Sequence, residues 1–236
     1  NEFEVKQVKN INAYLVASEN VIVEKLSKPN SQLPEMSFGN KAVDGGNLLL
    51  DSNELNELKM PSSLKNKLIR KFYGSSEFIR GNSRYCLWIE DKNLSLALSI
   101  PAIQERIDKV KCVRLASPDK SANEMAERSH QMREMKSAIT RTVIIPRVSS
   151  ESRLYLPVGL LSANTSVGDS AFALYDPPIW AISLIASRMH LLWVKTICGK
   201  LKTDFRYSNT MGWNTFPVPK LTEKNKADLT RCAENI

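Results

Sequence analysis

Short apolar runs of strand length are interspersed in this chain with longer segments whose apolar residues recur at helical spacing. Strands are expected at Leu48–Leu50, Glu77–Ile79, Tyr85–Ile89, Val143–Val148, Leu154–Leu161 and Ala171–Tyr175. Helices are expected from Asp51 or Ser52 to Lys59, and over Leu64–Phe72, Pro101–Leu115, Ser121–Met135 and 178–198. Because the two kinds of element are intermixed, we expect an α/β or α+β fold with a twisted mixed β-sheet flanked by helices.

Proline marks the start of two of these helices. Pro101 suits the first turn of a helix because it lacks the N–H that would be unpaired there. Asp176, followed by Pro177 and Pro178, is a typical helix start, and Gly199 is a typical end. A core-facing stripe of residues three or four apart is predicted on this last helix: Ile182, Ile185, Met189, Leu192 and Trp193.

The two ends of the chain differ from its middle. Ala13–Val16 and Val21–Glu24 are short extended runs before a polar, Pro-containing stretch, so residues 1–43 are expected to be a connector from a preceding domain. Residues 44–220 are expected to form the main domain, starting at the Asp44-Gly45-Gly46 turn. Residues 221–236 are expected to begin a further helical segment. The chain starts at Asn1 and not at Met, so we expect a fragment of a longer protein.

The chain is basic, and its positive charge is concentrated in one stretch. The formal net charge is +8, and the segment from Arg128 to Arg206 carries +6, from eleven Lys or Arg residues against five Asp or Glu. Such a bias favours an anionic partner such as nucleic acid. A solvated basic surface that binds nothing gives the same composition, so charge alone leaves both interpretations open.

Cysteine and histidine usage limits the possible chemistry. The four cysteines form no CxxC pair and have mostly apolar neighbours: Cys86, Cys112, Cys198 and Cys232. We expect reduced, mostly buried thiols in a cytoplasmic protein. With only His130 and His190 beside them, no zinc-ligand spacing exists, and His190 is expected to be a structural histidine. No apolar run has the length of a bilayer span, so no membrane partner is expected.

The stretch from Ser149 to Tyr155 combines a carboxylate with a guanidinium two residues later. If this stretch is extended, Glu151, Arg153 and Tyr155 share one face. A Glu can accept from cytosine N4 and an Arg can donate two hydrogen bonds to guanine O6 and N7, so the pair suits one C·G base pair. The alternative is a surface ion pair that contributes little, and local chemistry alone favours it.

Basic and hydroxyl side chains gather around the end of the last predicted helix: Lys195, Lys200, Lys202, Arg206, Tyr207 and Ser208. The cations could compensate the helix dipole at its C-terminus. They could also contact phosphates together with the hydroxyls, since such groups make most contacts to a nucleic-acid backbone.

Several stretches resemble the target recognition domain of MmeI-like restriction–modification enzymes, which fuse nuclease, adenine methyltransferase and DNA recognition in one polypeptide. They are 44–50 (DGGNLLL), 78–88 (FIRGNSRYCLW), 148–161 (VSSESRLYLPVGLL), 187–208 (SRMHLLWVKTICGKLKTDFRYS) and 209–219 (NTMGWNTFPVP). The resemblance runs from about Ala13 to Pro219. One departure is Gly212-Trp213, where a Tyr-Asn pair is more usual in the family.

The resemblance implies a non-catalytic module that recognises double-stranded DNA. In the family, the Glu and Arg of an SSExR stretch lie among the base-reading residues, and here they match Glu151 and Arg153, with Tyr155 on the same expected face. The residues expected at or near the DNA backbone are Arg80, Asn82, Arg147, Ser149, Ser150, Lys195, Lys200, Lys202, Arg206, Tyr207 and Ser208. The implied partners are DNA and the methyltransferase domain of the same polypeptide. S-adenosylmethionine is the implied cofactor of the longer protein, with none in this chain.

Two other functions remain open at this point. One is a packing module that contacts the methyltransferase domain without reading bases. The other is a small metal-dependent nuclease that uses Glu90 and Lys92, but the same Glu-x-Lys pattern recurs at Glu57, which shows how weak it is. The chain has neither a Gly-rich cofactor loop nor an Asn-Pro-Pro-Tyr motif, so methyltransferase chemistry is not expected within it.

Overall fold

The computed structural model describes residues 5–236 and divides into two compact units. Unit 1 comprises the N-terminal segment to Glu35, the stretch Val148–Leu156 and Ile179–Ile236, and unit 2 comprises Met36–Arg147 and Pro157–Pro178. Residues 1–4 of the predicted connector lie outside the described residues. The connector and domain limits predicted from the sequence concern the longer protein, and they stay predictions.

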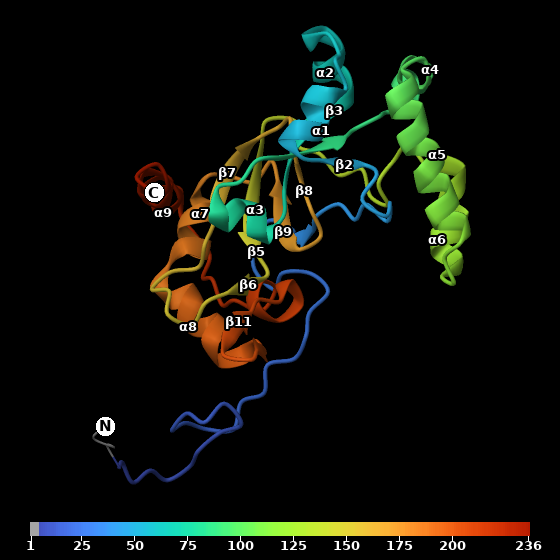
Figure 1. Ribbon diagram of the computed structural model, residues 1–236. Coiled ribbons are helices and arrows are strands. Elements are labelled where there is room, and N and C mark those ends of the chain that lie inside the picture. Colours follow the sequence, from blue (N-terminus) through green and yellow to red (C-terminus); the bar gives the residue numbers. More distant parts are fainter. Residues whose placement is uncertain (1–4) are drawn as a thin grey trace. The chain divides into compact units, whose positions relative to one another are not determined.

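Unit 2 contains two four-stranded sheets (Figure 1). The first is antiparallel, in the order β1 (Ser37–Phe38), β9 (Ala171–Tyr175), β5 (Arg141–Pro146) and β7 (Gly159–Ser162). The second is mixed, in the order β2 (Leu49–Leu50), β4 (Arg84–Leu87), β3 (Ile69–Tyr73) and β8 (Thr165–Val167), with β3 parallel to β8. Helices and strands are thus mixed as expected, and the strands are divided between two small sheets, one of them mixed.

The helices of unit 2 are short except for one. They are α1 (Ser52–Glu57), α2 (Ser62–Leu68), α3 (Ser75–Arg80), α4 (Leu94–Leu98), α5 (Pro101–Leu115) and α6 (Lys120–Glu124), with 3-10 turns at Asp91–Asn93 and Met125–Arg128. Asp51 caps α1 by accepting from the N–H groups of Asn53 and Glu54, as expected for the residue before a helix. The long helix α5 has exactly the predicted bounds and lies along one edge of the unit in Figure 1.

Three elements of unit 2 differ from their sequence-based expectation. The predicted helix Leu64–Phe72 ends at Leu68, because residues from Ile69 onward pair with β4 on one side and β8 on the other. The predicted strand Glu77–Ile79 is part of α3, which ends at Gly81 with a positive φ of 70°. The predicted helix Ser121–Met135 is reduced to α6 and one 3-10 turn.

The core of unit 2 is mostly apolar, and it encloses one cation, Arg114. Leu48, Leu68, Leu87 and Ile103 are almost fully inaccessible and belong to one hydrophobic cluster. Arg114, at the end of α5, is also fully buried. Its five N–H groups donate to the carbonyl oxygens of Ala42, Val43, Met125, Arg128 and Gln131 at 2.7–3.0 Å. The guanidinium therefore joins α5 to two chain segments that have little regular structure.

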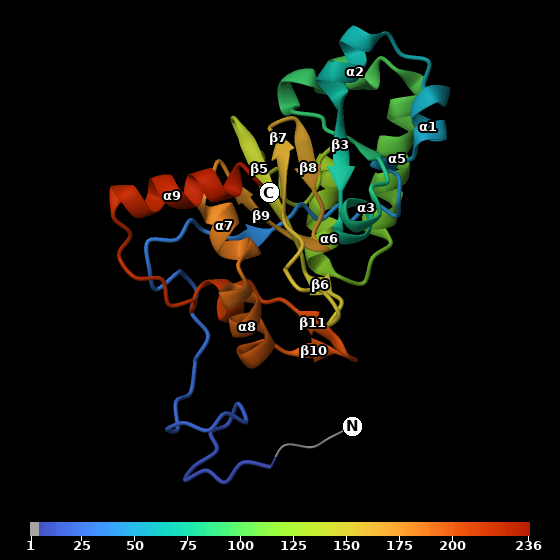
Figure 2. The same ribbon diagram turned by 90° about the vertical axis from the view of Figure 1, so that its left-hand side faces the viewer.

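Unit 1 combines three helices with a small antiparallel sheet (Figure 2). The sheet has the order β10 (Lys200–Leu201), β11 (Asp204–Arg206) and β6 (Val148–Ser149). The helices are α7 (Trp180–Ala186), α8 (Arg188–Ile197) and α9 (Glu223–Ala233), with a π-helical turn at Asn209–Trp213. In both views α9 lies beside α7, and Ser183 donates to the carbonyl of Leu229 at 2.6 Å.

The predicted long helix 178–198 is broken at Ser187. This residue has extended backbone, and its hydroxyl accepts from the N–H of His190, so it caps a new helix. The break shifts the helical phase, and two residues of the predicted stripe lie on the surface: Met189 is 73% exposed and Leu192 is 64% exposed. Trp193 of the same stripe is half-buried near Phe216. Asp176 does not cap α7, because its carboxylate accepts from the backbone N–H groups of Ile139, Thr140 and Arg141.

The segment 209–216 holds the N-terminal part of unit 1 in place. The indole of Trp213 is fully buried and donates to the carbonyl of Pro34 at 2.8 Å. The side-chain amide of Asn214 donates to the carbonyl of Leu26 at 2.7 Å, and the backbone carbonyl of Asn214 accepts from the N–H of Asn30. Trp213 at the position that departs from the family pattern is therefore a packing residue.

Further expectations about the N-terminal segment, the cysteines and the membrane can be compared with the structure. Ala13–Val16 forms a turn and not the expected extended run, and neither it nor Val21–Glu24 pairs in a sheet. All four cysteines are free, but only Cys86 is fully buried, while Cys112 and Cys232 are exposed. Within residues 5–236, no helix has the length and apolar character needed to cross a bilayer.

Candidate nucleic-acid interface

The predicted base-reading residues lie in an exposed loop of unit 1, Ser150–Leu156, which we name the 150–156 loop. Glu151, Arg153 and Tyr155 are all exposed, and only Leu156 is buried. The loop turns because the N–H of Arg153 donates to the carbonyl of Ser150 and the N–H of Ser152 donates to the Ser150 hydroxyl. Hydroxyl side chains often support turns in this way.

This loop corrects the strand expected at Leu154–Leu161 and the extended conformation expected around Glu151. Strand β6 ends at Ser149, where its pairing with β11 ends, and the next strand, β7, starts only at Gly159. Pro157 lies in the gap and has no N–H to contribute to a ladder. The three predicted base readers are therefore neighbours in a turn and do not share a strand face.

Glu151 pairs with a lysine of the adjacent hairpin and not with Arg153. Its carboxylate lies 3.7 Å from the ammonium of Lys200, and both side chains are about half exposed. An exposed pair of this kind contributes little to stability, so it can exchange for other partners at low cost. Arg153 has no ion pair with any residue from 5 to 236, which leaves its guanidinium available.

Strands β10 and β11 form a hairpin that carries three exposed cations, and we name it the basic hairpin (Lys200–Arg206). Leu201 pairs with Asp204, and the turn between them places Lys202 at a positive φ of 57°. Lys200, Lys202 and Arg206 are exposed. The hairpin is attached to the 150–156 loop through the pairing of Phe205 with Ser149 and Arg206 with Val148.

The ring of Phe205 supports two of the predicted phosphate-contacting lysines. Phe205 is buried, and the ammonium groups of Lys195 on α8 and Lys200 on β10 lie 5.0 and 5.7 Å from its ring centre. Cations within about 6 Å of an aromatic face are attracted to it. The two lysines from different elements are thereby held on one surface with Glu151.

Tyr207 and Ser149 are buried, which argues against their predicted contact with a DNA backbone. Tyr207 is 3% exposed and Ser149 is 4% exposed. The Tyr207 hydroxyl lies 2.9 Å from Nε2 of His190, which is fully buried. Burial lowers the pKa of His190 to about 3, so the imidazole is neutral, and its expected structural role is confirmed. Ser208 is half-buried and caps the turn at Asn209–Trp213 through the N–H of Met211.

A groove of about 360 Å³ next to the 150–156 loop was not predicted from the sequence. Leu154 lies on one side, and Met189, Leu191 and Leu192 of α8 lie on the other, with Arg188 and Lys195 at the rim. Met189 and Leu192 lie on the surface because the break at Ser187 turns them outward, whereas Leu191 is buried. The residues around Ser187 favour a continuous helix, so the break was not predicted. The polar pair Ser187-Arg188 inside an apolar run was the one local indication of it.

Three predicted backbone-contacting residues belong to unit 2. Arg80 ends α3 and Asn82 follows in the turn, and both side chains are exposed. Arg147 is half-buried, donates to the carbonyl of Asp169 at 3.1 Å and lies 4.8 Å from the ring centre of Phe38. Its guanidinium therefore already has a structural role.

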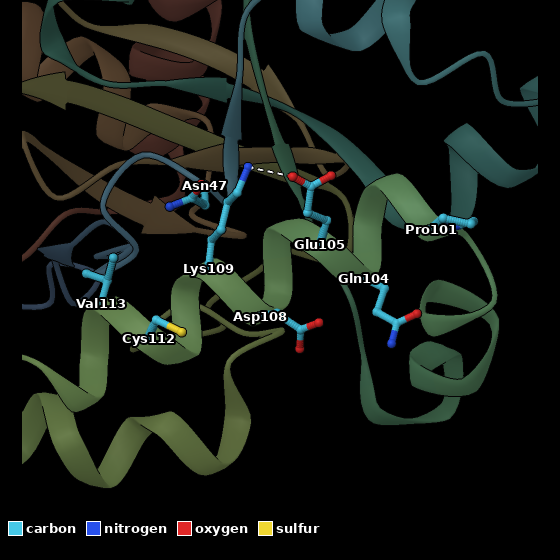
Figure 3. Close-up of a pocket in the computed structure, with 8 residues that line it drawn as sticks. All are labelled: Asn47, Pro101, Gln104, Glu105, Asp108, Lys109, Cys112 and Val113. Atoms are coloured by element: carbon cyan, nitrogen blue, oxygen red, sulfur yellow. Dashed lines mark ion pairs between the residues drawn. The ribbon is translucent and has the colours of Figure 1, made fainter.

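Unit 2 also contains a groove along α5 and the Glu-x-Lys pattern that was considered for a nuclease. A shallow groove along α5 contains the ion pair between Lys109 and Glu105, together with Asp108 and the exposed Cys112 (Figure 3). Glu90 of the Glu-x-Lys pattern pairs with Lys92 at 2.6 Å and approaches Arg70 at 3.8 Å. Within residues 5–236, no group of three or more His, Cys, Asp or Glu side chains is arranged to hold a metal ion.

Comparison with known proteins identifies the family. A family model described as "MmeI, target recognition domain" matches residues 17–220. The chain belongs to this family. The resemblance inferred from the sequence motifs is thereby confirmed for most of the chain.

Two similar proteins place this MmeI-type target recognition domain within longer chains. "DNA methyltransferase A" of Bacillus subtilis (strain 168) is 40% identical over 226 residues, which is 95% of this chain and 26% of that protein. A solved structure of the type IIL restriction–modification enzyme MmeI in complex with DNA matches with a TM-score of 0.88 and 32% identity, over 96% of this chain and 30% of that one. The chain thus spans between a quarter and a third of the length of these relatives, and the expected mixture of helices and sheets is confirmed.

Proposed function

We propose that this chain is the module that recognises the DNA sequence for a bacterial restriction–modification DNA methyltransferase. The observation that supports this most strongly is the surface formed by the 150–156 loop and the basic hairpin. The loop exposes the carboxylate of Glu151, the guanidinium of Arg153 and the phenol of Tyr155. Two lysine ammonium groups lie beside it, close to the ring of Phe205. The family and the DNA-bound relative support the same function.

The two parts of this surface have different roles in the proposal. Lys195, Lys200, Lys202 and Arg206 contact phosphates, which gives affinity and register without sequence information. Glu151 and Arg153 reach base edges in the major groove, where a carboxylate accepts from cytosine N4 and a guanidinium donates to guanine. On binding, Glu151 exchanges its Lys200 partner for a base, and Lys200 becomes free for a phosphate.

The longer protein supplies the chemistry. We propose that it transfers a methyl group from S-adenosylmethionine to N6 of a flipped adenine in its methyltransferase domain. This chain contributes the choice of sequence, and no cofactor site is assigned to it. An endonuclease domain in the same polypeptide is compatible with the proposal, and such an enzyme would work on DNA in the bacterial cytoplasm.

The first experiment measures binding of the chain to duplex DNA over a range of salt concentrations. We expect weak binding whose logarithm falls linearly with the logarithm of salt concentration. Lys200→Ala with Lys202→Ala should lower affinity equally for different sequences, while Lys224→Ala in α9 serves as a control for loss of charge. An affinity for duplex DNA that does not change with salt concentration would contradict the proposal.

The second experiment tests base reading in the longer protein. Replacing Glu151 with Lys and Arg153 with Asp reverses the donor and acceptor pattern, so the base accepted at one position of the methylated motif should change. A single replacement should mainly weaken methylation, since a good bidentate contact contributes about 1–3 kcal/mol of discrimination. The motif is obtained by sequencing methylated genomic DNA, and an active double variant with the original motif would show that these residues do not read bases.

The apolar groove beside the loop favours a second, additional role in packing against another part of the longer protein. Leu154, Met189 and Leu192 are 64–73% exposed in this chain, which is costly for a surface that stays in water. Met189→Asp should then destabilise the longer protein while duplex binding by the isolated chain is unchanged.

A further inference from the structure

Unit 2 contains a large cleft that is lined by none of the residues predicted to contact DNA. Its volume is about 990 Å³, and it lies where α2, β3, β4 and β8 come together, in the region that Figure 2 shows around the α2 and β3 labels. The charged residues that line it are Lys65, Lys67, Arg70, Lys71, Lys92 and Glu90. We name this feature the basic cleft.

The cations of the basic cleft are only partly neutralised. Glu90 is the one acidic residue in the lining, and it pairs with Lys92 at 2.6 Å and with Arg70 at 3.8 Å. Lys65, Lys67 and Lys71 have no ion-pair partner among residues 5–236. Three uncompensated positive charges in one concave surface attract anions more strongly than the same charges scattered over a convex one.

The strand register places one of these lysines on the floor of the cleft. Lys71 of β3 pairs with Tyr85 of β4 on one side and with Thr165 of β8 on the other. Residues opposite each other on neighbouring strands point to the same face of a sheet, so an ammonium, a phenol and a hydroxyl form one row. Lys65 and Lys67 extend from α2, the helix that leads directly into β3.

Arg70 and Trp88 give the cleft a rigid wall. The guanidinium of Arg70 lies 4.2 Å from the centre of the Trp88 ring and donates to the Ser137 hydroxyl at 2.7 Å. Trp88 itself is buried. A cation fixed in this way does not lose side-chain entropy when a ligand binds.

The other lining groups are neutral hydrogen-bonding side chains, which indicates the class of ligand. They include the amides of Asn66, Asn93 and Asn164 and the hydroxyls of Ser162 and Thr165. Lysines combined with amides and hydroxyls are typical of contacts to phosphate oxygens and sugars. The volume far exceeds that of one phosphate ion, so a chain of phosphates fits better than a single anion.

We propose that the basic cleft is a second DNA-binding site, which holds the phosphodiester backbone of a duplex through Lys65, Lys67 and Lys71. This inference rests on the proposed function for its ligand, but it concerns different residues in the other unit. Because the lysines contact phosphates, the cleft contributes affinity for any sequence and leaves the choice of bases to the 150–156 loop.

The experiment compares the chain with a triple variant, Lys65→Gln, Lys67→Gln and Lys71→Gln. Fluorescence anisotropy with a labelled duplex gives the dissociation constant between 50 and 200 mM salt. Each lost phosphate contact lowers the salt slope by about 0.9, so the slope should fall by about 2.7. The ratio of wild-type to variant affinity should then shrink by about 40-fold across this range of salt.

Two matched variants control for net charge and for folding. Lys109→Gln, Lys111→Gln and Lys120→Gln remove the same charge from exposed positions of unit 2 outside the basic cleft and should keep the wild-type slope. Lys65→Arg, Lys67→Arg and Lys71→Arg keep the charge and should restore binding. Circular dichroism identifies any variant that fails to fold. If the glutamine variant fails, the salt slope of the folded arginine variant is compared with that of wild type instead.

The outcomes separate this inference from the proposed function. If wild-type chain binds duplex DNA and the glutamine variant has the same affinity and slope, the inference is wrong and the proposed function stands. The inference is also wrong if the glutamine substitutions leave duplex binding unchanged and weaken only the association with the rest of the longer protein. The basic cleft would then bind an acidic protein surface and not DNA. If wild-type chain binds no duplex at low salt, both fail.

Discussion

Replacing Arg114 with Met should destabilise unit 2 more than any exposed substitution. The side chain is fully buried and gives all five of its N–H groups to backbone carbonyls. Met fills a similar volume but donates nothing, so these carbonyls lose their partners in the core. No carboxylate of residues 5–236 forms an ion pair with Arg114, so the charge is stabilised by these backbone oxygens and by the more distant Asp44. Burial lowers the pKa of Arg114 to about 10, and the group stays charged at pH 7.

The expected loss is about 3–5 kcal/mol. An unsatisfied buried acceptor costs about 1–3 kcal/mol, but five such costs do not add fully. The carbonyl of Arg128 also accepts from the N–H of Gln131, and removal of the guanidinium recovers the cost of burying a charge. The net figure is a large part of the ~5–15 kcal/mol that stabilises a typical domain. Arg114→Lys should lie between wild type and Arg114→Met, because an ammonium has only three donors.

Urea unfolding followed by far-ultraviolet circular dichroism measures this loss. Lys111→Met, on the exposed face of the same helix, should stay within about 0.5 kcal/mol of wild type. Hydrogen exchange should locate the weakening in the segments around Val43 and Gln131, which the guanidinium holds. An Arg114→Met variant as stable as the Lys111→Met control would refute the reasoning.

Two further predictions concern stability. The pKa of His190 is lowered to about 3 in the folded chain from about 6.5 unfolded, so the unfolded state binds the extra proton and stability falls as the pH drops from about 6.5 towards 3, by up to ~1.4 kcal/mol per pH unit. His190→Gln should remove this part of the pH dependence, measured as unfolding free energy against pH, and an unchanged profile would contradict it. Gly39→Ala should cost about 1–3 kcal/mol or more, because its Cβ would lie 2.4 Å from the carbonyl oxygen of Gly168, whereas Gly199→Ala meets nothing within 4 Å and should be neutral in thermal unfolding. Equal melting temperatures for the two alanine variants would count against the close approach at Gly39.

Elements with strong local signals could be predicted from the sequence. Pro101–Leu115 is correct at both ends because a proline at the first turn agrees with apolar spacing that continues through Val110. Ala171–Tyr175 is also correct, since a short apolar run there is followed directly by Asp176, whose positive φ of 50° ends the strand. In both cases the local preference and the tertiary structure agree.

Elements decided by distant partners could not be predicted. The helical pattern of α2 continues in the sequence past Leu68, but the residues that follow pair with β4 and β8 and form strand β3. Arg114 continues the spacing of Ile107 and Val110 on the buried face of α5, but an arginine near a helix end is normally exposed. Only the approach of the segments near Val43 and Gln131 makes it a buried cation. Contacts between segments so far apart in the sequence cannot be predicted from the local spacing of apolar residues.

The candidate interface shows the same division. Glu151 and Arg153 are exposed, as a base-contacting role requires, but the predicted strand was wrong because strand pairing stops at Ser149. Tyr207 was expected near DNA as part of a basic and hydroxyl-rich stretch, yet alternation along β11 and beyond turns it inward to His190. The basic cleft was missed altogether, because Lys65, Lys71 and Thr165 are brought together only by the parallel pairing of β3 with β8.

The position of Glu151 and Arg153 in a loop has a consequence for changing the recognised sequence. Their side chains are exposed, and the Glu151–Lys200 pair contributes at most about 1 kcal/mol, so replacing both residues removes little of the folding free energy. The loop backbone depends instead on Ser150, which accepts from the N–H groups of Ser152 and Arg153. Loss of methylation by a variant at 151 and 153 therefore indicates altered recognition, whereas loss by a variant at Ser150 combines altered recognition with a changed loop. Since a strand position would couple each side chain to cross-strand neighbours, a turn supported by its own serine allows the two proposed base-reading residues to change with a smaller effect on the fold.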